Sequence, residues 1–197
     1  MSCRRTLRSR RWLAGLVAMV PVGTLLAMFV MVSPASADVG PMSITSGLPG
    51  NNCLDDWMDN QNPLGSALVD VFQCNGTYAQ FFSYGNGNNT LQLSYYPGFE
   101  TGPGAPGAIL MCLDVAGGGT ADGTPVRLYA CNGTPAQTWV PDTTSIGGPA
   151  QLVNPQSGKC LDDPDGALTP PGGPPTQLQI WDCINNDTNQ IWSSAAF

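Results

Sequence analysis

The sequence contains no histidine and very few basic residues. Without histidine, the chain has no imidazole for metal binding or for general acid–base catalysis near neutral pH. Five of the seven Lys and Arg residues lie within the first 11 positions, so Arg127 and Lys159 stand against all 14 acidic residues in the remainder. Nucleic acids and anionic membranes are bound through basic patches. We therefore expect neither to be a partner.

The sequence also lacks the residues that several other kinds of active site require. The absence of histidine excludes Ser-His and Cys-His pairs, and the sequence has no glycine-rich phosphate-binding motif. The single glutamate, Glu100, lies in a stretch rich in glycine and proline, a poor place for a rigid catalytic acid. Residues 163–166, Asp-Pro-Asp-Gly, resemble part of a calcium loop but lack its full alternation of acids. We predict a protein that is not an enzyme and has no metal or other cofactor.

A long apolar run occurs near the N-terminus, over residues 12–32. It follows five arginines and precedes Ala35-Ser36-Ala37, an order typical of a secretory signal peptide cleaved after A-x-A. The run is also long enough to anchor the chain in a membrane, but glycine and proline interrupt it. We expect residues 1–37 to be removed and residues 38–197 to be secreted as one domain.

Six cysteines remain after the predicted cleavage, and an even number in an exported chain indicates disulfides. They belong to three copies of one unit. Each copy contains Cys-Leu-Asp, a second cysteine 19–23 positions after the first, and Gln-x-aromatic 6 or 7 residues further on. Because each copy supplies two cysteines, we predict one disulfide within each copy: Cys53–Cys74, Cys112–Cys131 and Cys160–Cys183.

Apolar and other residues alternate just before the second cysteine of each copy, at 68–72, 125–130 and 178–182. Such alternation predicts half-buried strands. With abundant glycine and proline and no helical period, the mature chain is predicted to be all-β. The predicted buried faces carry Val69 and Val71, Val126 and Leu128, and Leu178 and Ile180. The opposite faces pair Asp70 with Phe72, Arg127 with Tyr129, and Gln179 with Trp181.

The copies differ in length. We place them at about 43–110, 111–149 and 150–197, with an insertion at 83–109 in the first copy. Tyr95, Tyr96 and Phe99 lie in this insertion.

Three units of Cys-Leu-Asp, cysteine and Gln-x-aromatic resemble the ricin-type β-trefoil lectin domain, a carbohydrate-binding module of secreted bacterial glycosidases. The resemblance covers about Ser43 to Trp192 and is nearest in the third copy. It implies a β-trefoil, which is a six-strand barrel capped by three hairpins, with one sugar pocket possible per copy. In that family the aspartate after Cys-Leu accepts hydrogen bonds from the sugar. The aromatic residue two positions before the second cysteine stacks on the sugar ring, and an Asn-Gln pair adds polar contacts.

The family pattern implies a different set of sugar-binding residues in each copy. The third copy retains the whole set and is the predicted main site: Asp162, Gln179, Trp181, Asn189 and Gln190. The second copy retains Asp114, Tyr129 and Gln137, with Ala136 in place of the asparagine. The first copy, predicted to be weakest, retains Asp55, Phe72 and Gln80, with Ala79 and Phe82 replacing the asparagine and the tryptophan. The same pattern places Trp139 and Trp192 in the core.

These expectations lead to a main prediction and two alternatives. We predict a secreted, lectin-like protein that recognises galactose- or pentose-type sugars or polysaccharides mainly through the third copy. A flat aromatic ring can cover the C–H face of a sugar while a fixed carboxylate and amide bind its hydroxyls. One alternative is a trefoil that binds or inhibits a protein, such as a hydrolase, through the insertion. The other is an accessory module whose catalytic partner is encoded elsewhere.

Overall fold

The computed structural model describes residues 39–57, 67–85, 87–94, 110–142, 148–195 and 197. The predicted signal peptide lies outside these ranges, as do Tyr95, Tyr96 and Phe99 of the predicted insertion. All the described residues fall within one structural unit, Ala35–Phe197.

The described residues form thirteen short strands and five single-turn 3₁₀ helices, as the alternating sequence pattern predicts for an all-β chain. Among them no helix is long and apolar enough to cross a bilayer. The strands are β1 (Val39–Met42), β2 (Thr45–Ser46), β3 (Asn52–Asp56), β4 (Ala67–Gln73), β5 (Phe82–Gly85), β6 (Thr90–Leu93), β7 (Met111–Val115), β8 (Thr124–Ala130), β9 (Val140–Asp142), β10 (Gln151–Asn154), β11 (Lys159–Asp162), β12 (Gln179–Trp181) and β13 (Trp192–Ser193). The 3₁₀ helices are η1 (Tyr78–Gln80), η2 (Ala116–Gly118), η3 (Pro135–Gln137), η4 (Pro164–Gly166) and η5 (Thr188–Gln190).

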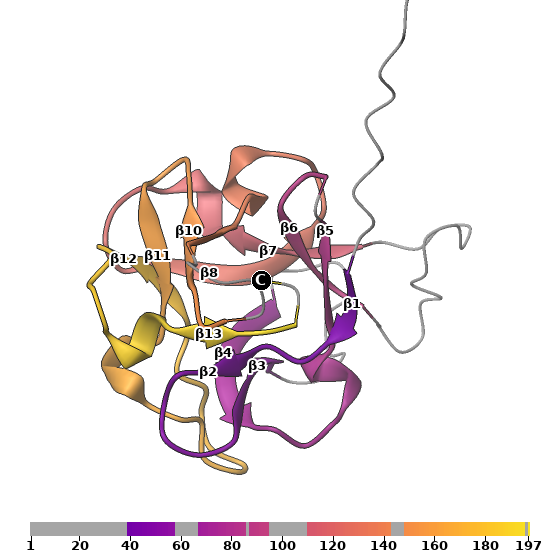
Figure 1. Ribbon diagram of the computed structural model, residues 1–197, viewed down its shortest axis with the longest axis vertical. Coiled ribbons are helices and arrows are strands. Elements are labelled where there is room, and N and C mark those ends of the chain that lie inside the picture. The colour runs from indigo at the N-terminus through magenta and orange to yellow at the C-terminus, as the bar shows by residue number, and fades with distance from the viewer. Residues whose placement is uncertain (1–38, 58–66, 86, 95–109, 143–147, 196) are drawn as a thin grey trace, which may run out of the picture. The chain divides into compact units, whose positions relative to one another are not determined.

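The three copies form successive sectors around a common centre, which gives the β-trefoil fold (Figure 1). In each copy the Cys-Leu-Asp strand pairs antiparallel with the strand before the second cysteine, giving the pairs β3–β4, β7–β8 and β11–β12. Strands from different copies also pair, β4 with β8 and β8 with β12. Near the two ends of the described chain, β2 pairs with β13. The ring of copies is therefore closed by backbone hydrogen bonds.

The same register recurs in each of these hairpins and determines which residue faces the aspartate of Cys-Leu-Asp. The first cysteine of a copy lies opposite the aromatic residue, as in Cys160 opposite Trp181. Two positions on, the aspartate lies opposite the residue that precedes the aromatic by two. These opposed pairs are Asp55 with Asp70, Asp114 with Arg127, and Asp162 with Gln179.

The core confirms the predicted buried faces. All six aliphatic residues predicted to be buried in β4, in β8 and at or just before β12 have no exposed surface. Phe82, Trp139 and Trp192 are also fully buried. The indole Nε1 of Trp139 donates to the carbonyl of Leu113 at 3.0 Å, and that of Trp192 to the carbonyl of Leu161 at 3.1 Å. Each of these two tryptophans thus ties the Gln-x-Trp triplet of its copy to the Cys-Leu-Asp strand.

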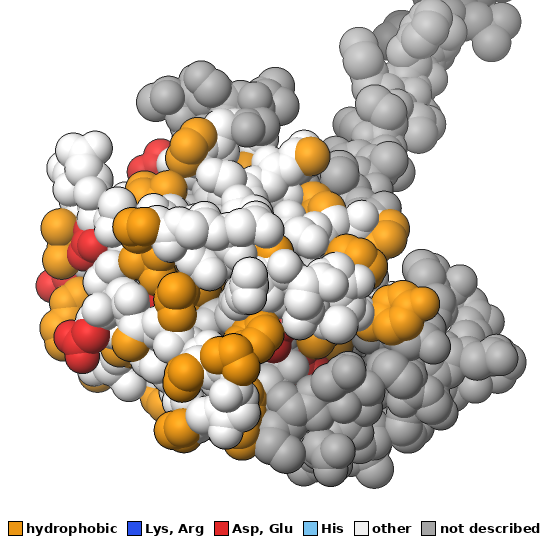
Figure 2. Space-filling view, turned by 90° about the horizontal axis from the view of Figure 1, so that it is seen from below, with side chains coloured by type: hydrophobic (Ala, Val, Ile, Leu, Met, Phe, Trp, Pro, Cys, Tyr) orange, Lys and Arg blue, Asp and Glu red, His pale blue; other side chains and the backbone are white. Residues whose placement is uncertain are grey.

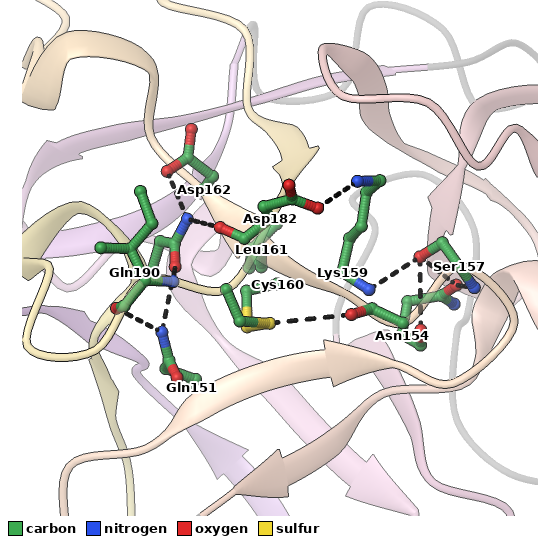
Figure 3. Close-up of a disulfide and its surroundings, with 12 residues drawn as sticks. Gln151, Asn154, Ser157, Lys159, Cys160, Leu161, Asp162, Asp182 and Gln190 are labelled. Atoms are coloured by element: carbon green, nitrogen blue, oxygen red, sulfur yellow. Dashed lines mark hydrogen bonds and ion pairs between the residues drawn. A yellow bond between two sulfur atoms is a disulfide. The ribbon is translucent and has the colours of Figure 1, made fainter.

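The three predicted disulfides are present, with Cα–Cα distances of 5.1, 5.0 and 5.1 Å. Figure 3 shows the surroundings of the third, between Cys160 and Cys183. The sequence separations are 21, 19 and 23. By chain entropy, a loop of this size stabilises the folded state by about 3 kcal/mol.

The first part of the predicted insertion is ordinary trefoil structure. Strands β5 and β6 form an antiparallel hairpin, and its counterpart is the hairpin β9–β10, which spans the predicted boundary between the second and third copies. The extra length of the first copy therefore lies within 95–109, outside the described residues.

Candidate functional site

Four of the five residues predicted for the third copy converge on one pocket. Asp162 comes from the end of β11, Gln179 and Trp181 from β12, and Asn189 from η5. The pocket has a volume of about 390 Å³. Its lining residues are Asp162, Pro164, Asp165, Gln179, Trp181, Ile184, Asp187 and Asn189. A flat ring, an amide and a carboxylate therefore share one concave surface.

Two side-chain amides hold the Asp162 carboxylate in position. Gln179 Nε2 donates to Oδ2 at 2.8 Å, and Gln190 Nε2 donates to Oδ1 at 3.1 Å. Burial raises the pKa of Asp162, while the hydrogen bonds from the two glutamines lower it. A carboxylate oxygen can accept more than one hydrogen bond, so each oxygen retains capacity for a ligand hydroxyl.

Gln190 does not line the pocket. Its side chain is fully buried, and Figure 3 shows it between Asp162 and Gln151. The amide oxygen accepts from the backbone of Ile184 at 2.8 Å and from Gln151 Nε2 at 3.0 Å. The amide nitrogen donates to the carbonyl of Asp182 at 3.0 Å as well as to Asp162. Direct sugar contact is incompatible with this arrangement, and the role of Gln190 is to hold the aspartate.

The matching glutamines of the other copies are placed in the same way. Gln137 and Gln80 are both fully buried. Gln137 donates to Asp114 Oδ2 at 3.2 Å and to the carbonyl of Ala130 at 3.0 Å. Gln80 donates to the carbonyl of Gln73 and accepts from the backbone of Asn75. Our prediction that these glutamines touch sugar is therefore corrected, because a buried amide with internal partners cannot also reach a ligand.

Trp181 is partly open to solvent and is supported by the second copy. Its relative exposure is 39%. Gly123 lies beside it, since a Cβ built on this glycine would stand 3.9 Å from Trp181 Cζ3. Asp182, the next residue, is tied to the same turn, because its backbone N–H donates to Asp122 Oδ1 at 2.9 Å. Lys159 Nζ lies 2.7 Å from that Asp122 oxygen and also pairs with Asp182. The backbone next to the Trp181 ring is therefore held in place by hydrogen bonds and ion pairs.

Asn189 borders the pocket next to a glycine that the sequence pattern did not identify. A Cβ at Gly166 would stand 2.8 Å from Asn189 Oδ1, and Gly166 has a φ of +60°. The carbonyl of Asn189 accepts from the backbone of Asp163 at 3.0 Å, which joins η5 to the start of the η4 turn. Gly166 therefore leaves the space that the asparagine amide occupies.

The second copy has a pocket of about 260 Å³ with a different chemistry. Its lining includes Asp114, Arg127 and Tyr129. Arg127 Nε donates to Asp114 Oδ1 at 3.0 Å, and the guanidinium carbon lies 4.6 Å from the centroid of the Tyr129 ring. A cation therefore occupies the position that Gln179 has in the third copy, while Ala136 replaces the asparagine.

The first copy has a pocket of about 340 Å³ that includes a wall from another copy. Asp55 and Phe72 line it as predicted. Thr169, Pro170, Gly172 and Gly173, in the third-copy segment between η4 and β12, form the opposite side. The backbone N–H of Thr169 donates to the carbonyl of Val71 at 3.0 Å, which attaches this segment to β4.

A buried acid in the first copy replaces the amide found in the third. Asp70 faces Asp55 across the hairpin and is fully buried. Burial raises the pKa of Asp70 to about 6. Burial, followed by the charges of Asp162, Asp70 and Asp165, raises the pKa of Asp163 to about 7. In the first copy, the position opposite Asp55 therefore holds the acid Asp70 and no amide that could donate to Asp55.

Comparison with known proteins identifies the family. The model of the ricin-type beta-trefoil lectin domain matches residues 41–192. The chain belongs to this family. A curated relative, the probable lipoprotein EnvE of Salmonella typhimurium, is 32% identical over 124 residues, which is 63% of this chain and 53% of EnvE. The chain therefore spans about half the length of that relative.

Solved structures show the same fold at low sequence identity. The designed threefold-symmetric protein ThreeFoil has a TM-score of 0.58 at 20% identity, covering 77% of this chain and 95% of its own. An exo-β-1,3-galactanase from Clostridium thermocellum has a TM-score of 0.56 at 20% identity, and the match covers 79% of this chain and 30% of the galactanase chain. A Polyporus squamosus lectin, solved with a bound influenza-binding epitope, has a TM-score of 0.55 at 18% identity, and the match covers 78% of this chain and 48% of the lectin chain.

Proposed function

We propose that this member of the ricin-type family is an exported carbohydrate-binding protein without catalytic activity, and that the third-copy pocket is its main sugar site. The observation that carries the proposal is the partly exposed Trp181 ring beside the fixed carboxylate of Asp162. Gln179 and Asn189 complete the contact set, and Gln190 holds the aspartate from behind.

The chemistry of the pocket suits a neutral sugar. An indole can stack on the C–H face of a pyranose ring, while Asp162 accepts from ring hydroxyls and Asn189 can both donate and accept. A hydroxyl buried without a partner costs about 1–3 kcal/mol, so the fixed polar groups select the sugar whose hydroxyls meet them. Asp165 and Asp187 also line the pocket. Three carboxylates favour hydroxyl donors over anionic ligands.

The relatives support this class of ligand and the absence of a reaction. The family is named for lectin domains, and one structural neighbour was solved with α-methyl-D-galactoside. The neighbouring galactanase supports an accessory role on polysaccharide as the biological setting. Export is supported by the composition of residues 1–37 and by the name of the relative, a probable lipoprotein.

Binding to galactan, arabinan and xylan, soluble and insoluble, tests the proposal in wild type and Trp181→Ala. We expect the substitution to weaken binding by about tenfold, the equivalent of about 1.4 kcal/mol of lost stacking. Tyr78→Ala is the matched control, because Tyr78 is an exposed aromatic residue that lines none of the three pockets. If wild type binds no glycan, or Trp181→Ala binds as well as wild type, the proposal fails. The first of these outcomes favours a protein partner.

A further inference from the structure

We propose that the second-copy pocket binds a sugar that carries a carboxylate, such as a uronic acid, through the guanidinium of Arg127. The inference rests on the proposed carbohydrate-binding function and extends it to a second pocket with a ligand of different charge. It depends on one difference between the copies: where the third copy has the neutral amide of Gln179, the second copy has the cation of Arg127.

Arg127 and Gln179 are equivalent by register. Arg127 on β8 lies opposite Asp114, and Gln179 on β12 lies opposite Asp162. Both side chains donate to their aspartate, at 3.0 Å and 2.8 Å, and both line their pocket. The exchange therefore places a positive charge at a position where the third copy presents only an amide.

The guanidinium has donors left for a ligand. Asp114 engages only Nε of Arg127, and within the described residues no hydrogen bond involves the two terminal nitrogens. The Arg127 side chain is 27% exposed and lines the pocket, so these nitrogens are accessible from it. Their planar pair of N–H groups matches the two oxygens of a carboxylate, which gives short, charge-assisted hydrogen bonds.

The same contacts make the pocket a poor site for a neutral sugar. The guanidinium carbon lies 4.6 Å from the centroid of the Tyr129 ring, so one face of that ring is already covered. Arg127 and Gln137 each donate to one oxygen of Asp114, which is 5% exposed. Ala136 supplies no amide. A ligand gains most here by pairing with the cation.

The acidity of the chain limits the ligand to one with an isolated charge. After the predicted cleavage, Arg127 and Lys159 are the only basic side chains, and Lys159 is already shared by Asp122 and Asp182. Figure 2 shows several acidic side chains among hydrophobic and polar ones on one face. A polyanion would be repelled by this surface, whereas a single uronic acid on an otherwise neutral chain pairs locally with Arg127.

Calorimetric titration with methyl glucuronide and methyl galacturonide, each against its neutral methyl glycoside, tests the inference. For wild type at pH 7 we expect the better uronide to bind about tenfold tighter than its neutral partner, as for one charge-assisted pair. Arg127→Gln, which reproduces the third-copy residue, should remove this preference. Arg127→Lys should keep part of it, because the charge remains but the planar fork is lost.

Controls separate this site from general charge effects. Asn51→Asp changes the net charge by the same amount as Arg127→Gln at an exposed position that lines none of the three pockets, and it should leave the preference intact. Thermal melts establish that each variant is folded. Equal affinity of wild type for uronide and neutral glycoside overturns the inference, as does a preference that survives in folded Arg127→Gln. Tighter binding of a sulfated galactoside than of either uronide overturns the assignment to a carboxylate.

The neutral polysaccharides and Trp181→Ala test the third copy independently. If uronide binding depends on Arg127 but neutral glycans do not bind, the proposed main site fails and this inference stands. If neutral glycans bind through Trp181 and uronides show no preference, the reverse holds.

Discussion

The first and third copies share one backbone register but differ in the residue that faces the pocket aspartate. In the third copy Gln179 donates to Asp162, and both line the pocket. In the first copy Asp70 faces Asp55 from a fully buried position. The difference shows that the trefoil frame tolerates an amide or an acid at this position. The frame depends on the cysteines, the core aliphatic residues and the buried glutamine, whereas ligand preference depends on a few side chains at the pocket.

The largest effect is expected from removing the buried glutamine of the third copy. Gln190→Ala deletes hydrogen bonds to Asp162, Asp182, Ile184 and Gln151 and leaves buried polar groups without partners. We expect a loss of about 3 kcal/mol in unfolding free energy, measured by urea denaturation. Sugar binding at the third copy should also weaken, because Asp162 loses one of its two supports.

The matched substitution in the first copy tests whether the effect on sugar binding is specific to Gln190. Gln80→Ala removes hydrogen bonds to Gln73 and Asn75 and should reduce stability by a smaller amount, about 2 kcal/mol, while third-copy binding stays as in wild type. Equal effects of both substitutions on binding would show that Gln190 does not act through Asp162.

A smaller effect is expected from the buried acid of the first copy, and it depends on pH. The pKa of Asp70 is raised to about 6, so the folded state holds this proton more tightly than the unfolded chain. The contribution of Asp70 to stability is therefore greatest below pH 4, decreases as pH rises to about 6, and stays low above that. Asp70→Asn should equal wild type near pH 4 and exceed it by roughly 1–2 kcal/mol at pH 8, after allowance for solvent screening.

Urea denaturation at several pH values measures this difference. Asp142→Asn, which removes one acid from an exposed position on β9, is the control and should show no such divergence. A constant difference between Asp70→Asn and wild type across pH 4–8 would contradict the raised pKa.

We expect the smallest change in stability from substitution of Gly166. Its φ of +60° disfavours any residue with a Cβ, and that Cβ would stand 2.8 Å from Asn189 Oδ1. Gly166→Ala should cost about 1 kcal/mol of stability and weaken third-copy sugar binding severalfold by displacing the asparagine. Gly118→Ala in the second copy has similar backbone strain, with φ of +65°, but no asparagine at the matching position. It should therefore lower stability alone. Calorimetry and thermal melts on the same samples distinguish the two outcomes.

The features that were predictable from the sequence repeat in every copy. Two cysteines per unit indicated the pairing, and alternation in segments such as 125–130 indicated which faces are buried. Trp139 and Trp192 were recognisable as core because each is the aromatic residue of a Gln-x-Trp triplet in the same place in its copy. These features depend on short-range pattern, which a single sequence displays directly.

Some of the features that were missed depend on contacts between distant parts of the chain. Gln190 is buried with side-chain partners that include Asp162 and Gln151, which lie 28 and 39 residues away. The placement of Gly123 beside Trp181 joins two copies. The stacking of Arg127 on Tyr129 is local, and the alternation already placed both on one face. Its effect on the pocket emerged only when the hairpin register brought Arg127 opposite Asp114.

The segment that carries Thr169 and Pro170 has a consequence for exchanging copies between related proteins. It belongs to the third copy but walls the pocket of the first. Exchange of one copy between relatives would therefore transfer a pocket without its wall and alter a second pocket at the same time. The copies are therefore interlocking parts: replacing a whole copy alters two pockets, whereas a single substitution within a copy can alter one.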